Sequence, residues 1–353
     1  MTLSRPYALG VDIGGTQVKA ASAERLEDGA VRATTICLEA SGPAMRAVAG
    51  IAGDELVVGA EATELARREP QNCARGFIAR VGDSTPYILG NHQITAAQLC
   101  AAVVEAVTVH ARAERGSEPQ RISLVHPPNW RPWRITATLA ALAERGLVGI
   151  RAISSPIAVA ASYGGDGTLP SNIPVAVCDL GRHTMSVTLV QRRADDSLAE
   201  LGQSQICAYP GATSFTWPAE TDGPSDQMLS QLQGLIDRAF VAAGISSPGE
   251  CAVILAGGLS RMPSIVDYLA QLRAAPVLMQ VDPQYAGSIG AAASATTGQP
   301  STALLQLTSR EPRWVRSARG TEPVRGAVEP LRFIARPRPI TPLAAIHSVR
   351  ASL

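Results

Sequence analysis

Short apolar runs that stop at glycine turns dominate the first part of the chain. The run at residues 7–11 breaks at Asp12 and two glycines and resumes at Val18, which predicts a strand, a tight turn and a returning strand. Residues 95–115 carry apolar side chains at a spacing near 3.6 behind Thr95. We therefore predict a long helix that Thr95 caps at its N-terminus.

The opening pattern recurs in the second half of the chain. Residues 175–179 are again an apolar run that ends in Asp before a glycine turn, and residues 185–190 follow as a returning strand. The Gly-, Pro- and Ser-rich stretch 165–174 predicts a boundary between two lobes. Further strands are predicted at 122–126, 150–153 and 252–255, and further helices at 60–68, 131–145, 156–163, 227–243, 264–272 and 284–296.

Composition and charge narrow the class of protein. The chain has 46% hydrophobic and 17% charged residues, as a globular protein has, and its net charge of +1 indicates neither nucleic acid nor membrane as a partner. Residues 301–353 carry nine Arg and three Glu, which places +6 on this segment and −5 on residues 1–300. We expect this Pro- and Arg-rich segment to be irregular, and to bind an acidic partner, fold back on the acidic body or stay solvated.

The cysteines and the N-terminus bear on the compartment. Six scattered cysteines without a Cys-x-x-Cys pair indicate reduced thiols. The first residues lack the pattern of a signal peptide, and no apolar run reaches the roughly 20 residues of a membrane span. These features predict a cytoplasmic protein.

The two Asp-Gly turns suit phosphate chemistry. Glycine lets the backbone bring N–H groups close to phosphate oxygens, and a carboxylate can hold Mg²⁺ directly or through its waters. An ordinary hairpin has the same local sequence, but two copies facing each other would form a phosphate clamp. The candidate residues are Asp12, Gly14, Gly15 and Thr16 in the first turn, and Asp179, Gly181, Arg182 and Thr184 in the second.

A third glycine element follows a predicted strand and opens a predicted helix. Gly257 and Gly258 would let the backbone pass close to a purine, and Arg261 could stack on it. A helix start with close packing would have the same sequence.

The ordered set of these elements resembles the nucleotide-binding half of the seventy-kilodalton heat-shock chaperones, within the actin-like ATPase superfamily. Residues 12–16, 179–184 and 255–263 are similar to that family's two phosphate loops and its adenosine loop. The resemblance implies a two-lobed actin-like (ribonuclease H-like) α/β fold with duplicated mixed sheets flanked by helices. Lobe I would span residues 1–165 and lobe II residues 166–300. Further similar segments are 58–62, 69–72, 77–80, 125–130, 153–164 and 282–292.

The sequence departs from the family at the positions that serve catalysis. Arg182 and His183 replace two glycines of the second phosphate loop, where large side chains would strain the turn or fill the site, unless Arg182 clamps a phosphate. Arg75 aligns best with the family's phosphate-contacting lysine. Ser155 and Ser186 stand where the family has Glu and Asp. Groups that position Mg²⁺ and water are therefore largely replaced, although Asp12 and Asp179 remain.

Two parts that proteins of that family have are reduced or have too few residues in this chain. Only 77 positions separate Asp179 from Ala256, so the upper part of lobe II, which would contact adenine and ribose, is reduced. The 53 residues from 301 onward are too few for the family's peptide-binding unit.

These features predict an ATP- or ADP-binding, chaperone-like module with Mg²⁺, with weak or no ATP hydrolysis and a regulatory or scaffold role towards a protein partner. If catalysis survives, Asp12 and Asp179 would act through Mg²⁺ and water, and Arg75 would stabilise the transferring phosphoryl group. Two alternatives remain: a nucleotide-independent interaction scaffold, and a sugar kinase, because Asp-Ile-Gly-Gly-Thr at 12–16 is common in sugar kinases.

Overall fold

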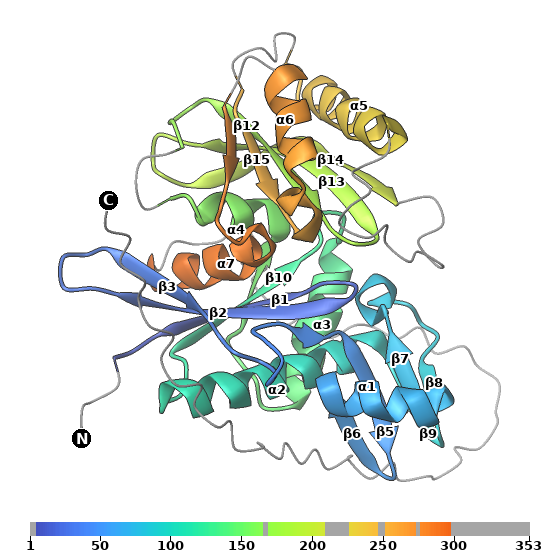
Figure 1. Cartoon of the computed structure of the whole chain (residues 1–353). Coiled ribbons are helices and arrows are strands. Elements are labelled where there is room, and N and C mark those ends of the chain that lie inside the picture. Colours follow the sequence, from blue (N-terminus) through green and yellow to red (C-terminus); the bar gives the residue numbers. More distant parts are fainter. Residues whose placement is uncertain (1–4, 165–168, 209–225, 246–250, 273–275, 298–353) are drawn as a thin grey trace, which may run out of the picture.

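A computed structural model describes residues 5–164, 169–208, 226–245, 251–272 and 276–297. Helices and mixed sheets build a mixed α/β protein, in which two sheets of the same strand order lie one above the other (Figure 1). In each sheet, three consecutive strands pair antiparallel, and two later strands extend the first of them in parallel. The duplicated sequence pattern thus corresponds to a duplicated sheet.

The first sheet contains the first predicted strand–turn–strand. Its parallel pairs bury apolar side chains on both faces, as in other parallel sheets that helices cover. The order is β11-β10-β1-β2-β3, and β4 pairs with the start of β2. The strands are β1 (Ala8–Ile13), β2 (Gln17–Arg25), β3 (Val31–Thr35), β4 (Met45–Arg46), β10 (Arg121–His126) and β11 (Arg151–Ser154).

The second sheet repeats this arrangement in the order β14-β13-β12-β15-β16. Sequence patterns predicted its centre but neither of its edges, because the outer strand mixes apolar and polar residues that are mostly half-buried or exposed, and the last strand has only three residues. The strands are β12 (Pro174–Leu180), β13 (Thr184–Arg192), β14 (Leu198–Ala208), β15 (Val253–Ala256) and β16 (Val277–Met279).

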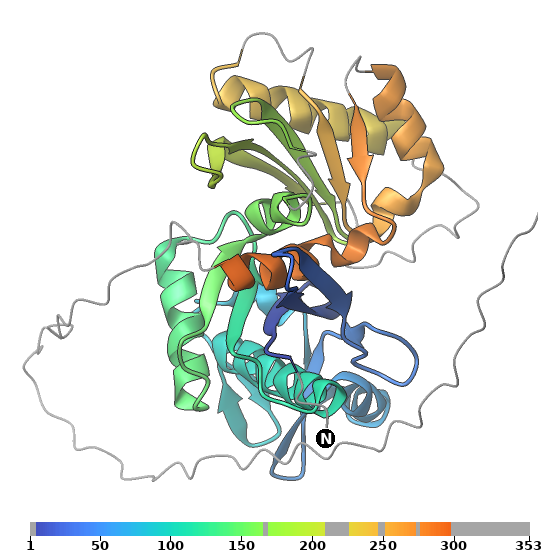
Figure 2. The same ribbon diagram turned by 90° about the vertical axis from the view of Figure 1, so that its left-hand side faces the viewer.

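Two helices of small residues form a layer between the sheets (Figures 1 and 2). Helix α4 (Ser155–Ala161) comes from the first half of the chain and packs on the second sheet, whereas α7 (Ala286–Thr297) comes from the end and packs on the first. The two helices cross so closely that a Cβ on Gly290 would lie 1.7 Å from the carbonyl oxygen of Ala158. A Cβ on Gly10 of β1 would lie 2.2 Å from the carbonyl oxygen of Ser288.

The outer faces of the two sheets are covered by other helices. Helix α2 begins with a capping box, in which the Thr95 side chain accepts a hydrogen bond from the backbone of Gln98 and the Gln98 side chain accepts one from Thr95, so the predicted N-cap is confirmed. Large apolar clusters fill the space between these helices and the sheets. The covering helices are α2 (Ala96–Arg115) and α3 (Pro132–Glu144) on the first sheet, and α5 (Asp226–Ala242) and α6 (Pro263–Leu272) on the second.

A small sheet with the strand order β6-β5-β7 lies at the lower right in Figure 1, and a hairpin lies beside it. Helix α1 packs on this sheet through Ala62 and Leu65. The elements are β5 (Val48–Ala52), β6 (Glu55–Val58), α1 (Gly59–Arg68), β7 (Cys73–Arg75) and the hairpin β8 (Tyr87–Leu89) and β9 (His92–Ile94).

Two further expectations concern the basic segment 301–353 and membrane-spanning helices. The segment 301–353, expected to be irregular and basic, lies outside the described residues. No helix within the described ranges combines the length and the apolar character needed to cross a bilayer.

Candidate functional site

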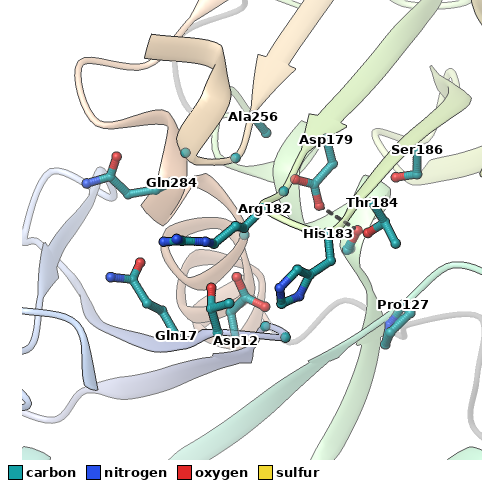
Figure 3. Close-up of a pocket in the computed structure, with 18 of the residues that line it drawn as sticks. Asp12, Gln17, Pro127, Asp179, Arg182, His183, Thr184, Ser186, Ala256 and Gln284 are labelled. Carbon is teal, nitrogen blue, oxygen red and sulfur yellow. Dashed lines mark hydrogen bonds between the residues drawn. The ribbon is translucent and has the colours of Figure 1, made fainter. Parts of the chain in front are cut away.

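A cleft of about 1030 Å³ lies at the turns of both Asp-Gly hairpins (Figure 3). We call the part of the structure around the first sheet the first lobe and the part around the second sheet the second lobe. The walls of the cleft come from β1–β2 and β10 of the first lobe and from β12–β13 and the loop after β15 of the second. Parallel strands that end at one edge of a sheet place their following loops together, which explains why segments far apart in sequence meet here. The cleft therefore forms where the two equivalent sheets face each other with equivalent edges.

The two hairpins that enter the cleft have the same local geometry. The Gly14 N–H donates to the carbonyl oxygen of Gln17 at 2.9 Å, and the Gly181 N–H donates to that of Thr184 at 3.0 Å. In the antiparallel register Asp12 lies opposite Lys19. Asp179 lies opposite Ser186 in the second hairpin. The duplication therefore extends to single hydrogen bonds, and differs in which residue faces each aspartate.

Asp179 is a carboxylate in a poorly solvated position. The Ser155 hydroxyl at the start of α4 donates to it at 3.5 Å, a long hydrogen bond. Burial, with the nearby negative charge of Asp12, raises the pKa of Asp179 to about 6, although Lys19 and Ser155 oppose the shift. This carboxyl therefore keeps a substantial protonated fraction near pH 6.

Asp12 already has a cationic partner. The Lys19 ammonium lies 3.6 Å from the Asp12 carboxylate, and the two side chains are only 14% and 22% exposed. The N-terminus of α7 approaches Asp12 from the other side, since a Cβ on Gly287 would lie 3.4 Å from its carboxylate oxygen. A helix N-terminus favours a negative charge, so Lys19 and α7 face the Asp12 carboxylate from two sides.

The third glycine element passes directly beneath the second hairpin. Gly257 has a φ of 86° and a Cβ there would lie 2.4 Å from the carbonyl oxygen of Leu180, so no other residue fits without a backbone shift. The 3₁₀ turn Gly258–Arg261 follows, and Arg261 donates to the Gln284 side chain at 3.5 Å. Gly258 has open space where a side chain would be.

Arg182 and His183 occupy the turn of the second hairpin in different ways. The exposed Arg182 side chain extends into the cleft, toward the side where Gln17 and Gln284 lie (Figure 3). The His183 ring instead packs on the first hairpin, because a Cβ on Gly15 would lie only 3.0 Å from its Nδ1. His183 thus fills part of the gap between the two glycine turns.

The wall formed by the end of β10 and the residues after it carries two stacked rings. The rings of His126 and Trp130 stack with centroids 5.9 Å apart. Burial lowers the pKa of His126, so its imidazole is neutral at pH 7. This wall supplies shape and no charge.

All but one of the predicted site residues line this cleft. They are Asp12, Gly14, Gly15, Thr16, Asp179, Gly181, Arg182, Thr184, Gly257, Gly258 and Arg261. Arg75 is the exception: it is exposed on the edge strand β7 and does not line the cleft, although the next residue, Gly76, does.

Further lining residues were not predicted from the sequence. Lys19, Arg46 and Arg134 add positive charge to the cleft, and Gln17, His126 and Gln284 add polar groups. A signal for Lys19 was present, because a hairpin with its turn at residues 14–16 pairs residue 12 with residue 19. No local pattern points to Arg134, which reaches the cleft from α3.

The lining fits a polyanion better than it fits a divalent cation. Among the residues that the structure describes, five basic side chains but only two acidic ones line the cleft, with glycine backbone from several loops. A divalent cation needs several oxygen ligands. Here Asp12 is paired with Lys19, Asp179 binds protons more tightly than a free carboxyl, and the described residues contain no group of three or more His, Cys, Asp or Glu side chains that could hold a metal.

The comparisons with known proteins indicate one relationship. No protein-family profile matches the chain. The chain is similar to the chaperone DnaK. The DnaK of Elusimicrobium minutum is 28% identical over 201 residues, which are 56% of this chain and 32% of DnaK. The DnaK of Endomicrobium trichonymphae is 25% identical over 150 residues, which are 42% of this chain and 24% of that protein.

The similarity to DnaK is partial. The chain covers less than a third of the length of either DnaK protein, so an activity of the whole chaperone does not transfer with the alignment. The identities of 28% and 25% support a distant relationship between this chain and the seventy-kilodalton heat-shock chaperones.

Proposed function

We propose that this protein is a nucleotide-binding module related to the heat-shock chaperones, with an actin-like fold, which binds ATP or ADP in the interlobe cleft. The observation that carries this proposal is the pair of equivalent Asp-Gly hairpins that meet in one basic cleft. Residues 1–300 carry a net charge of −5, yet five of the seven charged side chains that the described residues place in the cleft are basic. Concentrated positive charge beside bare glycine backbone suits a polyphosphate.

We further propose that the bound nucleotide is hydrolysed weakly or not at all. Phosphoryl transfer depends on groups that position the nucleophile and neutralise developing charge. Here Asp12 is held by Lys19, and Arg75, the residue aligned with a phosphate-contacting lysine, lies outside the cleft. His183 occupies the gap between the turns. A regulatory or scaffold role towards a protein partner is consistent with a site that binds nucleotide without turnover.

Calorimetric titration with ATP and with ADP tests the binding proposal. We expect a dissociation constant in the micromolar range, and we expect Gly258→Phe to weaken it at least tenfold, because the ring would fill open space in the cleft. Ala270→Phe, on the exposed surface of α6, is the matched control and should bind like the wild type. Equal binding by wild type and Gly258→Phe would place the nucleotide elsewhere.

A nucleotide-independent scaffold is the second candidate, and the position of His183 favours it. The ring lies against Gly15 and fills part of the space between the two hairpin turns.

His183→Gly separates the two candidates. If the cleft binds nucleotide, removing the ring should increase ATP affinity several-fold, because the hairpin turns can then approach the phosphates. If the protein is a scaffold, neither the wild type nor His183→Gly should give heat with millimolar ATP. Lower affinity in the variant would mean that His183 is itself a ligand of the nucleotide.

A further inference from the structure

Lys19 is the only lysine in the chain, among thirty arginines, and it points into the cleft. It lies in the middle of the first sheet on β2, between buried Val18 and Ala20, so the strand fixes its position. Its ammonium lies close beneath the first turn, 3.6 Å from where a Cβ on Gly14 would be. A compact ammonium therefore lies at the point where the phosphate site would begin.

Lys19 acts on both cleft carboxylates. Its ammonium is 3.6 Å from the Asp12 carboxylate. It also lowers the pKa of Asp179 from across the cleft, while Asp12 raises it, so all three charges lie within electrostatic range. Ser186, the equivalent residue of the second hairpin, carries no charge, and the duplicated geometry therefore provides one cation for two carboxylates.

We propose that the Lys19 ammonium takes the place of a divalent cation between Asp12 and Asp179, so that the cleft binds a nucleoside di- or triphosphate without a metal ion. This inference rests on the proposed nucleotide-binding function and specifies the ionic form of its ligand. The Lys19 ammonium has three N–H donors. One of them can donate to Asp12, and the others can donate to phosphate oxygens.

The physical reason is that Mg²⁺ and the Lys19 ammonium compete for the same position beside the carboxylates. Mg²⁺ requires near-octahedral oxygen ligands at about 2.0–2.1 Å, and it would have to approach the carboxylates from the space that the ammonium occupies. Mg²⁺ and the Lys19 ammonium are both positive, so they would repel each other strongly if both lay against the same carboxylates. Arg182 and Arg261, which also line the cleft, supply the remaining positive charge that a polyphosphate needs.

Titration with Mn²⁺ alone, followed by electron paramagnetic resonance, tests the role of Lys19 without any nucleotide. The wild type should leave Mn²⁺ free, whereas Lys19→Met should bind it at least tenfold more tightly, because two carboxylates then lack a cation. Lys19→Arg keeps the charge and should behave like the wild type. Arg67→Met removes one positive charge from the exposed surface of α1 and should also leave Mn²⁺ free. Tight Mn²⁺ binding by the wild type would overturn the inference.

Calorimetric titration of the wild type with ATP, in excess EDTA and separately in Mg²⁺, tests the metal-free ligand and needs no variant. The dissociation constants should agree within about threefold. In Lys19→Met, ATP binding should weaken at least tenfold in EDTA and recover in part with Mg²⁺. Binding that requires Mg²⁺ in the wild type would overturn this inference and leave the proposed function intact. No binding in either buffer would overturn both.

Discussion

Gly290→Ala should destabilise the protein by about 3 kcal/mol or more, although alanine is the better helix former by about 1 kcal/mol. The added methyl group would lie 1.7 Å from the carbonyl oxygen of Ala158 in α4, and both atoms belong to helix backbones or are fixed to them. No side chain can rotate away, so α4 and α7 must separate. Because each of these helices also packs on a sheet, the shift would disturb the contacts of both lobes.

Urea denaturation followed by circular dichroism measures this effect, and Gly234→Ala in α5 is its matched control. A Cβ at Gly234 would meet only the end of the Arg238 side chain, at 3.1 Å, which can move. The control should therefore be neutral or slightly stabilising. A midpoint for Gly290→Ala equal to that of the wild type would contradict the close helix crossing.

Asp179→Asn should stabilise the protein at pH 7 by about 1–3 kcal/mol. Burial and the charge of Asp12 raise the folded-state pKa of Asp179 to about 6, from 3.8 for a free side chain. Between these two values the folded state binds a proton that the unfolded state does not. The contribution of Asp179 to stability is therefore greatest below pH 4 and is lost as the pH rises through 6.

Thermal denaturation of wild type and Asp179→Asn from pH 4 to pH 7.5 tests this prediction. The two melting temperatures should diverge as the pH rises, with the variant the more stable at the upper end, because an amide needs no proton in a buried site. Asp267→Asn, on the exposed surface of α6, should follow the wild type throughout. A constant difference between Asp179→Asn and wild type across this range would mean that Asp179 does not titrate there. A gain of stability from losing this carboxylate would fit a residue kept for binding.

Local sequence patterns were sufficient for the elements that have a strong period or a clear stop. The α2 helix follows from its apolar spacing and from Thr95, and the two hairpins follow from apolar runs broken at Asp and glycine. Patterns failed for β14, where apolar and polar residues mix and most are half-buried or exposed, and for the three-residue β16. Both are edge strands, and only pairing with a neighbour defines them.

The sequence also determined most of the candidate site, because glycine turns after strands are recognisable without knowing what they face. It did not determine that Arg75 lies outside the cleft, since a residue beside a 3₁₀ turn can point either way until the small sheet of the first lobe is packed.

The sequence alone determined two copies of one strand–turn–strand unit, the residues at their turns, and a final helix of small residues. Only the tertiary structure decided that this helix, α7, packs on the first sheet and crosses α4, that Lys19 pairs with Asp12 within electrostatic range of Asp179, and that His183 reaches Gly15. The reason is physical. Strands, turns and helix caps depend on neighbours in the chain, whereas the charge of a cleft and the closeness of two helices depend on residues more than a hundred positions apart.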